Sequence, residues 1–247
     1  MPRCRHAIVL LVLLVISVSV LAGCKPASLV STSEEVSIGR QSAQQVESQY
    51  PVNKDPKLND MVTTIGNNLV RFSPRQDVEY TFKILDIDEV NAVSLPGGWI
   101  YVYKGLIDLA KNNPDQLAGV MAHEIGHIAA RHHADMIGRE TYAGLIVQTV
   151  TRGDVQQWAG LFADLTLLRW NRKHEYEADL LGIDIMFKSK QYDPQGLINF
   201  FGALEQKQKD NPSKFDQMFR THPVTAERIK RAQQHLDDLK AGRVQPK

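Results

Sequence analysis

The chain has 247 residues, of which 43% are hydrophobic and 23% are charged. This composition is that of a chain with a sizeable buried core, and it excludes the fibrous and intrinsically disordered classes. Lys plus Arg (29) and Asp plus Glu (28) nearly cancel, so no overall field attracts nucleic acid, and we expect no nucleic-acid partner.

The N-terminus has the layout of a secretory signal. Arg3 and Arg5 precede an almost wholly apolar stretch at residues 7–22, which ends in the sequence LAGC. A cysteine directly after Leu-Ala-Gly resembles the lipobox of bacterial lipoproteins, which implies cleavage before Cys24 and acylation of that residue. Lys25 stands where an aspartate would favour the inner membrane, so the pattern favours the outer membrane.

These features predict a lipoprotein signal peptide at residues 1–23, an acylated cysteine with a tether at residues 24–32, and one domain at residues 33–247. A signal anchor that stays uncut is the alternative. If Cys24 is acylated and Cys4 is removed with the signal, the mature chain has no free thiol. Disulfides, thiol catalysis and cysteine metal ligands are then excluded.

Most of the remaining chain has helical signals. Ser31-x-x-Glu34 is a capping box that predicts a helix to about Gln49, and Asn113-Pro114 opens another helix with an N-cap residue and a proline. Apolar spacing and helix start signals predict further helices at residues 56–72, 172–189, 194–209 and 225–240. Residues 140–170 are apolar with a break at residues 152–154, which predicts two buried helices or a hairpin over a cleft.

The strand signals are confined to residues 78–103. Residues 78–85 alternate as a strand does, and Pro96-Gly97-Gly98 is a turn signal between two β-prone stretches, so a hairpin is expected. Residues 99–103 form either an ordinary core strand or an edge strand that pairs with an extended peptide. The predicted fold is therefore α+β, mainly helical, with a small β-sheet.

The stretch HEIGH, residues 123–127, has the spacing of a metal site. On a helix, residues four apart differ by about 40° in direction, so His123 and His127 point the same way and can bind one ion. Glu124 can reach a water on that ion without binding the ion itself. Zinc is the ion that this pattern indicates.

Two candidates compete for the third metal ligand. His133 lies ten residues after His123, where a metzincin has its third histidine. That class needs a glycine where this chain has Ala130, the best helix former. If the helix continues, His133 lies about 240° round from His127, so we expect His132 and His133 on the surface.

The other candidate is a pair of carboxylates in a later helix. Glu175 and Asp179 are four residues apart and share one helical face, whereas Glu177 is expected in solvent. Glu175 would complete a set of two histidines and one glutamate with an open position for water. Asp179 would accept the free N–H of a ligand imidazole.

Four motifs occur in order along the chain: Asn91-Ala92 with Leu95-Pro96-Gly97-Gly98, then HEIGH, then Glu175-x-x-Ala178-Asp179, then Thr221-His222-Pro223. Together they resemble the HtpX and CAAX-prenyl-protease family of gluzincin zinc metallopeptidases, specifically its small bacterial lipoprotein members. The resemblance implies a zincin-like metallopeptidase domain at residues 33–247, with the small β-sheet beside the HExxH helix.

The resemblance also implies roles for single residues. It assigns His123, His127 and Glu175 to one Zn²⁺ per chain, and Glu124 to the general base. Asp179 matches the carboxylate that holds a ligand imidazole. His222 matches a histidine that in periplasmic relatives approaches the zinc, where it either blocks the ion or stabilises the tetrahedral intermediate. Arg228 is in reach of the same loop and is expected to assist.

The family's strand beside the active-site helix corresponds here to residues 97–103. This correspondence favours the edge-strand alternative, with Gly97, Gly98, Trp99 and Tyr101 binding an extended substrate.

The function expected from these residues is that of a zinc-dependent endopeptidase of the bacterial cell envelope, lipid-anchored through Cys24 and facing the periplasm. Its substrates would be extended or unfolded proteins, such as misfolded or unassembled envelope proteins. The alternatives are a zinc-bearing chaperone or outer-membrane assembly factor whose proteolysis is restrained by His222, and a structural lipoprotein with a vestigial site.

Overall fold

The computed structural model describes residues 30–110, 113–147, 155–165, 168–210 and 212–247. The predicted signal peptide, the acylation site Cys24 and most of the tether lie outside these residues. Among the described helices, none has both the length and the apolar character needed to cross a membrane.

The elements follow the predicted order with two additional helices, α4 and α10. The helices are α2 (Thr32–Gln49), α3 (Pro56–Val70), α4 (Lys104–Ala110), α5 (Pro114–Ala129), α6 (His132–Val147), α7 (Val155–Ala163), α8 (Arg172–Ser189), α9 (Gln195–Asp210), α10 (Pro212–Thr221) and α11 (Ala226–Lys240). The strands are β1 (Thr81–Leu85), β2 (Ala92–Ser94) and β3 (Trp99–Tyr103), with a 3₁₀ turn η1 (Pro96–Gly98) between β2 and β3. The predicted α+β, mainly helical fold is confirmed.

The predicted helix starts are present. Ser31 and Glu34 form the full capping box of α2, because each side chain bonds the other residue's backbone N–H. The side chain of Asn113 accepts the backbone N–H of Gln116, and Pro114 occupies the first turn of α5. These caps satisfy N–H groups that have no partner inside a helix.

The sheet of the described chain has the order β1-β3-β2. β2 and β3 form the predicted antiparallel hairpin, whose turn uses positive φ at Gly97 (75°) and Gly98 (121°). β1 pairs with β3 in parallel along its whole length, from Thr81 opposite Trp99 to Leu85 opposite Tyr103. The prediction of Trp99–Tyr103 as an edge strand is therefore wrong, because β3 lies in the middle and hydrogen-bonds on both sides.

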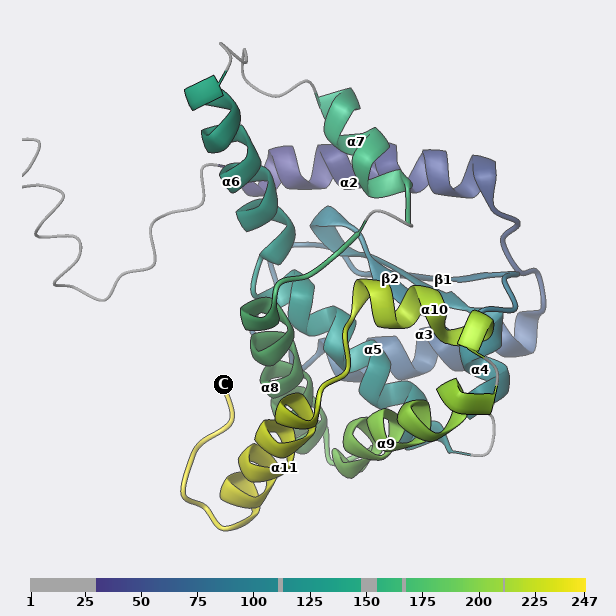
Figure 1. Ribbon diagram of the computed structural model, residues 1–247, viewed down its shortest axis with the longest axis vertical. Helices are drawn as coiled ribbons and strands as arrows, with labels where there is room; N and C mark the ends of the chain where they lie inside the picture. The colour runs from purple at the N-terminus through teal and green to yellow at the C-terminus, as the bar shows by residue number, and fades with distance from the viewer. Residues whose placement is uncertain (1–29, 111–112, 148–154, 166–167, 211) are drawn as a thin grey trace, which may run out of the picture.

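The sheet separates two layers of helices (Figure 1), since alternate side chains of a strand point to opposite faces. One face, with Ile84, Ile100 and Val102, packs on α3, α5, α8 and α9. The other face, with Tyr101 and Tyr103, packs on α2, α6 and α7.

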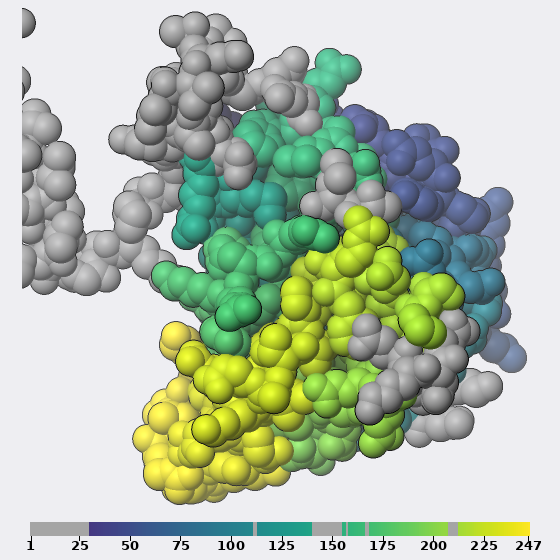
Figure 2. Space-filling model, viewed as in Figure 1, coloured from purple at the N-terminus to yellow at the C-terminus, as the bar shows by residue number. Residues whose placement is uncertain are grey.

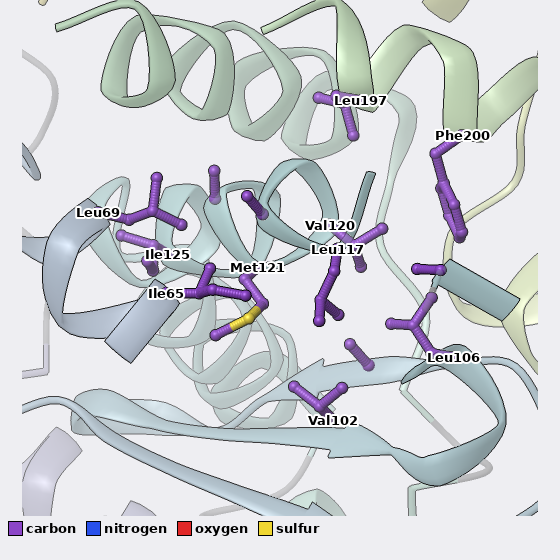
Figure 3. Close-up of a cluster of buried hydrophobic side chains, with 14 of the residues drawn as sticks. Ile65, Leu69, Val102, Leu106, Leu117, Val120, Met121, Ile125, Leu197 and Phe200 are labelled. Carbon is purple, nitrogen blue, oxygen red and sulfur yellow. The ribbon is translucent and has the colours of Figure 1, made fainter. Parts of the chain in front are cut away.

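Helix α5 lies in the larger of these two cores. Figure 3 shows Leu117, Met121 and Ile125 of α5 between the sheet, α3 and α9. These side chains are at most 2% exposed. The HExxH helix is therefore buried on nearly every side, which fixes the direction of its two histidines.

Candidate metal centre

His123 and His127 lie on one face of α5, with exposed fractions of 4% and 0%. Their Nε2 atoms are 3.1 Å apart, and their rings meet edge to face. His123 also directs its Nδ1 at Asp179 Oδ1, 2.8 Å away. With the proton on that Nδ1, Nε2 of His123 presents a lone pair to the space in front of His127.

Helix α8 brings the two predicted carboxylates to this face. The helices α5 and α8 pack closely at two glycines: a Cβ at Gly126 would lie 2.7 Å from the carbonyl oxygen of Ala178, and one at Gly182 would lie 3.0 Å from the backbone nitrogen of His123. Because of this close approach, Glu175 Oε1 reaches to 3.2 Å from His127 Nε2.

A fourth side chain, His222, arrives from the loop between α10 and α11. Its Nδ1 lies 3.2 Å from His123 Nε2 and 3.1 Å from Glu175 Oε1. Figure 2 shows the C-terminal helices, in yellow-green and yellow, running across this face of the molecule. His222 itself is 3% exposed.

These four atoms are spaced as ligands of one ion. One donor atom from each of His123, His127, Glu175 and His222 falls within a group no wider than 4.8 Å. A tetrahedral zinc with bonds of about 2.0–2.1 Å holds its ligand atoms about 3.3 Å apart, and four of the six separations in this group are 3.1–3.2 Å. The donor set and its spacing fit zinc, since a cation relieves the repulsion between converging lone pairs.

The electrostatic environment gives His127 and Glu175 the protonation states that metal ligands need, whereas it favours the protonated form of His222. Burial, with the charge of neighbouring His123, lowers the pKa of His127 well below its usual value, so this imidazole is neutral. Burial alone would raise the pKa of Glu175, but His222 and Arg228 hold it well below its usual range. Burial would lower the pKa of His222, but the charges of Glu175 and Glu124 raise it.

Arg228 lies behind the ligands rather than in front of them. Its guanidinium donates to both oxygens of Asp179, at 2.8 and 2.7 Å, and to the carbonyl oxygen of Pro223, and it also pairs with Glu175. It is 2% exposed. In this conformation Arg228 acts on the site through Asp179 and Glu175, which it keeps ionised; burial would raise the pKa of Asp179, but the Arg228 charge lowers it.

Glu124 is held by a residue that the sequence analysis did not single out. Its Oε2 accepts a hydrogen bond from Ser94 Oγ at 2.7 Å, and its Oε1 lies 3.3 Å from His222 Nε2. Ser94 is the last residue of β2 and is 1% exposed. The sequence signal for Ser94 was its position within the Asn91 to Gly98 motif.

The expected surface position of His132 and His133 is wrong. They are 2% and 0% exposed, because α5 ends at Ala129 and the chain bends at Arg131, which has the left-handed conformation (φ 59°), before α6 begins at His132. His132 Nδ1 lies 3.0 Å from His127 Nδ1, and His133 Nε2 lies 2.8 Å from the carbonyl oxygen of Ser94. His133 is therefore not brought to the metal group.

A buried ion pair stabilises the bend at Arg131. Arg131 donates to Glu35 Oε2 at 3.2 Å and to the carbonyl oxygen of Val30 at 2.7 Å. Arg75 donates to both oxygens of Glu35 and to the carbonyl oxygen of Ile128, near the end of α5. These contacts come from α2 and the loop before β1, so no helix-stop signal within α5 itself indicates the bend.

The prediction for Glu177 also needs correction. Its side chain is 25% exposed, and its Oε2 lies 3.6 Å from His132 Nε2. It is thus partly enclosed beside the site rather than fully in solvent.

The predicted substrate strand is not positioned to bind a peptide. Tyr101 points away from α5, and its hydroxyl lies 2.8 Å from Glu47 of α2. Gly97 and Gly98 form the tight turn against α2 and the segment before β1, where a Cβ would meet backbone atoms at 2.6 and 2.0 Å. Trp99 begins the central strand and packs with the same side of the sheet as Tyr101.

Comparison with known proteins agrees with this geometry. The chain is 27% identical to a beta-barrel assembly-enhancing protease of Yersinia pestis over 231 residues, and 25% identical to the protein of that name in Escherichia coli K12. In both cases the match covers 88% of this chain and 47% of the relative, so the chain spans about half the length of these relatives.

A third relative is similar in length. The metalloprotease LoiP of Escherichia coli K12 is 27% identical, with 84% of this chain and 81% of the relative covered. The family model for peptidase family M48 matches residues 56–236, a range that includes every residue of the metal group. The resemblance to zinc metallopeptidases is thereby confirmed at the level of this family rather than of its HtpX and CAAX-prenyl-protease branch: the chain belongs to peptidase family M48.

Proposed function

We propose that the chain is a zinc-dependent endopeptidase of the bacterial cell envelope, of the small lipoprotein type. The observation that carries this proposal is the buried group of His123, His127, Glu175 and His222, with Glu124 next to it. The names of the relatives, two beta-barrel assembly-enhancing proteases and one metalloprotease, support the same activity.

His123, His127 and Glu175 would hold the zinc. When bound, the ion acts as a Lewis acid that polarises the scissile carbonyl and lowers the pKa of water. Glu124 would accept a proton from the attacking water and pass it to the leaving amine nitrogen. Ser94 suits Glu124 to this role, because its hydrogen bond to Oε2 orients the carboxylate and leaves Oε1 directed at the site.

His222 restricts access to the metal position. Its Nδ1 takes the fourth position of the donor group, where the substrate or the water needs room. Substrate entry therefore requires the loop of His222 to move.

The same observation favours one alternative function. A chain whose metal position is filled by its own histidine could bind unfolded envelope proteins, or assist outer-membrane assembly machinery, with little cleavage. We propose misfolded or unassembled envelope proteins as the ligands in both cases, and membrane attachment through acylated Cys24 on the periplasmic side of the outer membrane.

The test measures zinc content and casein cleavage on one unlipidated preparation of the mature chain, beside Glu124→Gln and His222→Ala. We expect one zinc per chain, loss of cleavage in Glu124→Gln and faster cleavage in His222→Ala. Zinc without cleavage in all three proteins would support the chaperone alternative. A chain that takes up no zinc would refute the metal centre.

The localisation is tested separately. Incorporation of labelled palmitate into the wild type, but not into Cys24→Ala, and recovery of the wild type in the outer-membrane fraction would support the anchor. Recovery of unlabelled wild type in the soluble periplasm would contradict it.

A further inference from the structure

His132 lies directly behind the metal ligand His127. The two Nδ1 atoms are 3.0 Å apart, and the rings meet edge to face at 71° with centroids 5.0 Å apart. Both side chains are at most 2% exposed. The contact therefore joins two buried imidazoles in a geometry suited to an N–H···N hydrogen bond.

The positions of the neighbouring atoms determine which nitrogen donates. Nε2 of His127 faces His123 Nε2 and Glu175 Oε1, so it is the nitrogen that a metal would use. The proton of neutral His127 is then on Nδ1, which has to donate. His132 Nδ1 accepts, and the proton of His132 is on Nε2, the nitrogen that faces Glu177.

Stacking contacts keep both rings in these planes. Trp170 lies over His127, with centroids 4.4 Å apart and planes inclined by 26°. His174 lies over His132, with centroids 4.2 Å apart and planes inclined by 18°. His174 in turn is held by Asp135, at 2.8 Å from its Nε2. Neither imidazole can turn over without displacing one of these neighbours.

We propose that His132 is a positioning residue for the metal ligand His127: its Nδ1 accepts the Nδ1–H of His127 and so holds that imidazole with Nε2 toward the ion. The proposal rests on the function proposed above, in which His127 binds zinc. It also gives a role to the bend at Arg131, because this bend places His132 beside His127.

The two histidine ligands are thus oriented by different chemistry. Nδ1 of His123 faces the carboxylate of Asp179 at 2.8 Å, whereas Nδ1 of His127 faces a neutral imidazole. An imidazole supplies direction without adding another negative charge to a site that already contains Glu124, Glu175 and Asp179. Loss of such an outer hydrogen-bond partner typically weakens metal binding by about 10- to 100-fold.

The first test compares the zinc affinity of three variants, measured by competition with a chromophoric chelator. His132→Leu fills much of the same volume without an acceptor. His132→Asn places its amide oxygen near the former Nδ1 position. His235→Leu is the matched control, since it removes a histidine whose Nε2 lies 2.7 Å from a carboxylate oxygen of Asp184 and which contacts neither His127 nor His132.

We expect His132→Leu to bind zinc about 10- to 100-fold more weakly than the wild type, and His132→Asn to recover most of that loss. His235→Leu should bind as the wild type does. In the cobalt-substituted proteins, the visible absorption bands of His132→Leu should shift, since a freed His127 distorts the ligand geometry. Wild-type zinc affinity and an unchanged cobalt spectrum in His132→Leu would overturn the proposal, as would equal losses in the Leu and Asn variants.

A second measurement uses the wild type alone and stays decisive if His132→Leu does not fold. In the zinc-loaded, histidine-¹⁵N-labelled protein, we expect a scalar coupling across the hydrogen bond between the Nδ1 atoms of His127 and His132. A spectrum in which His127 Nδ1 is protonated without this coupling would refute the contact. Wild type that binds neither zinc nor cobalt would instead refute the proposed function, so the two failures are distinguishable.

Discussion

Replacement of Glu35 by Gln should destabilise the fold strongly, because the bend between α5 and α6 depends on a buried charge. Glu35 is 0% exposed and accepts from Arg75 at 2.9 Å on each oxygen, as well as from Arg131. The Gln side chain keeps the shape but leaves Arg75, itself 5% exposed, without its main counter-charge.

The expected loss of stability depends on the contacts that Arg75 retains in the variant. Removing one partner of a buried ion pair costs about 3–5 kcal/mol. Arg75 retains Asp77 at 3.0 Å, whose side chain is 56% exposed, and the carbonyl oxygen of Ile128. We therefore expect the lower end, about 3 kcal/mol, which for a chain of this size lowers the melting temperature by about 6–12 °C.

The assay is thermal unfolding followed by circular dichroism, with Glu227→Gln as the matched control. Glu227 pairs with Arg231 at 2.7 Å, but both side chains are about half exposed (49% and 55%), so the control should melt as the wild type does. Equal shifts in the two Gln variants, or a wild-type melting temperature for Glu35→Gln, would show that burial does not set the strength of this pair.

The remaining predictions concern three buried polar contacts. Burial lowers the pKa of His133 to about 4, below its unfolded value of about 6.5, so the unfolded chain binds the extra proton between these pH values. The neutral form of His133 thus contributes to the free energy of unfolding above about pH 6.5, and this contribution, on the order of 3 kcal/mol, is lost as the pH falls toward 4. The free energy of unfolding, measured with urea at pH 7 and pH 4.5, should therefore change less in His133→Leu than in the wild type. Ser94→Ala removes the hydrogen bond to the carboxylate of Glu124. Because hydrogen bonds to charged groups contribute about 1.5–3 kcal/mol, this variant should lower kcat by roughly 10- to 100-fold with KM and zinc content unchanged. A wild-type kcat would contradict the orienting role of Ser94. Tyr101→Phe should leave KM unchanged, because this hydroxyl bonds Glu47 on the far face of the sheet; a raised KM would reinstate β3 as a substrate strand.

The parts of the site that sequence periodicity predicts are those contained within one helix. His123 and His127 share a face of α5, and Glu175 and Asp179 share a face of α8, because residues four apart on a helix point the same way. The capping signals at Ser31 and Asn113 likewise act within a few residues. Such patterns are read correctly because they depend on local backbone geometry alone.

The wrong predictions share one cause, which is contact between segments far apart in the chain. Trp99–Tyr103 is a central strand because β1 joins it from 18 residues earlier, at Thr81 opposite Trp99. His132 is buried because Glu35, distant in sequence, stabilises the left-handed turn of Arg131. Neither contact produces a periodic pattern in the sequence of the residues that it affects.

The sequence alone was sufficient to name a metal-binding pair with its adjacent base and a second helix with two carboxylates, since side-chain direction within a helix follows from residue spacing. The tertiary structure alone decided that α5 and α8 meet at Gly126 and Gly182. It also decided that His132 and Ser94 hold the ligand and the base from behind. Those arrangements depend on how separate helices and strands pack, and packing is a property of surfaces assembled from the whole chain.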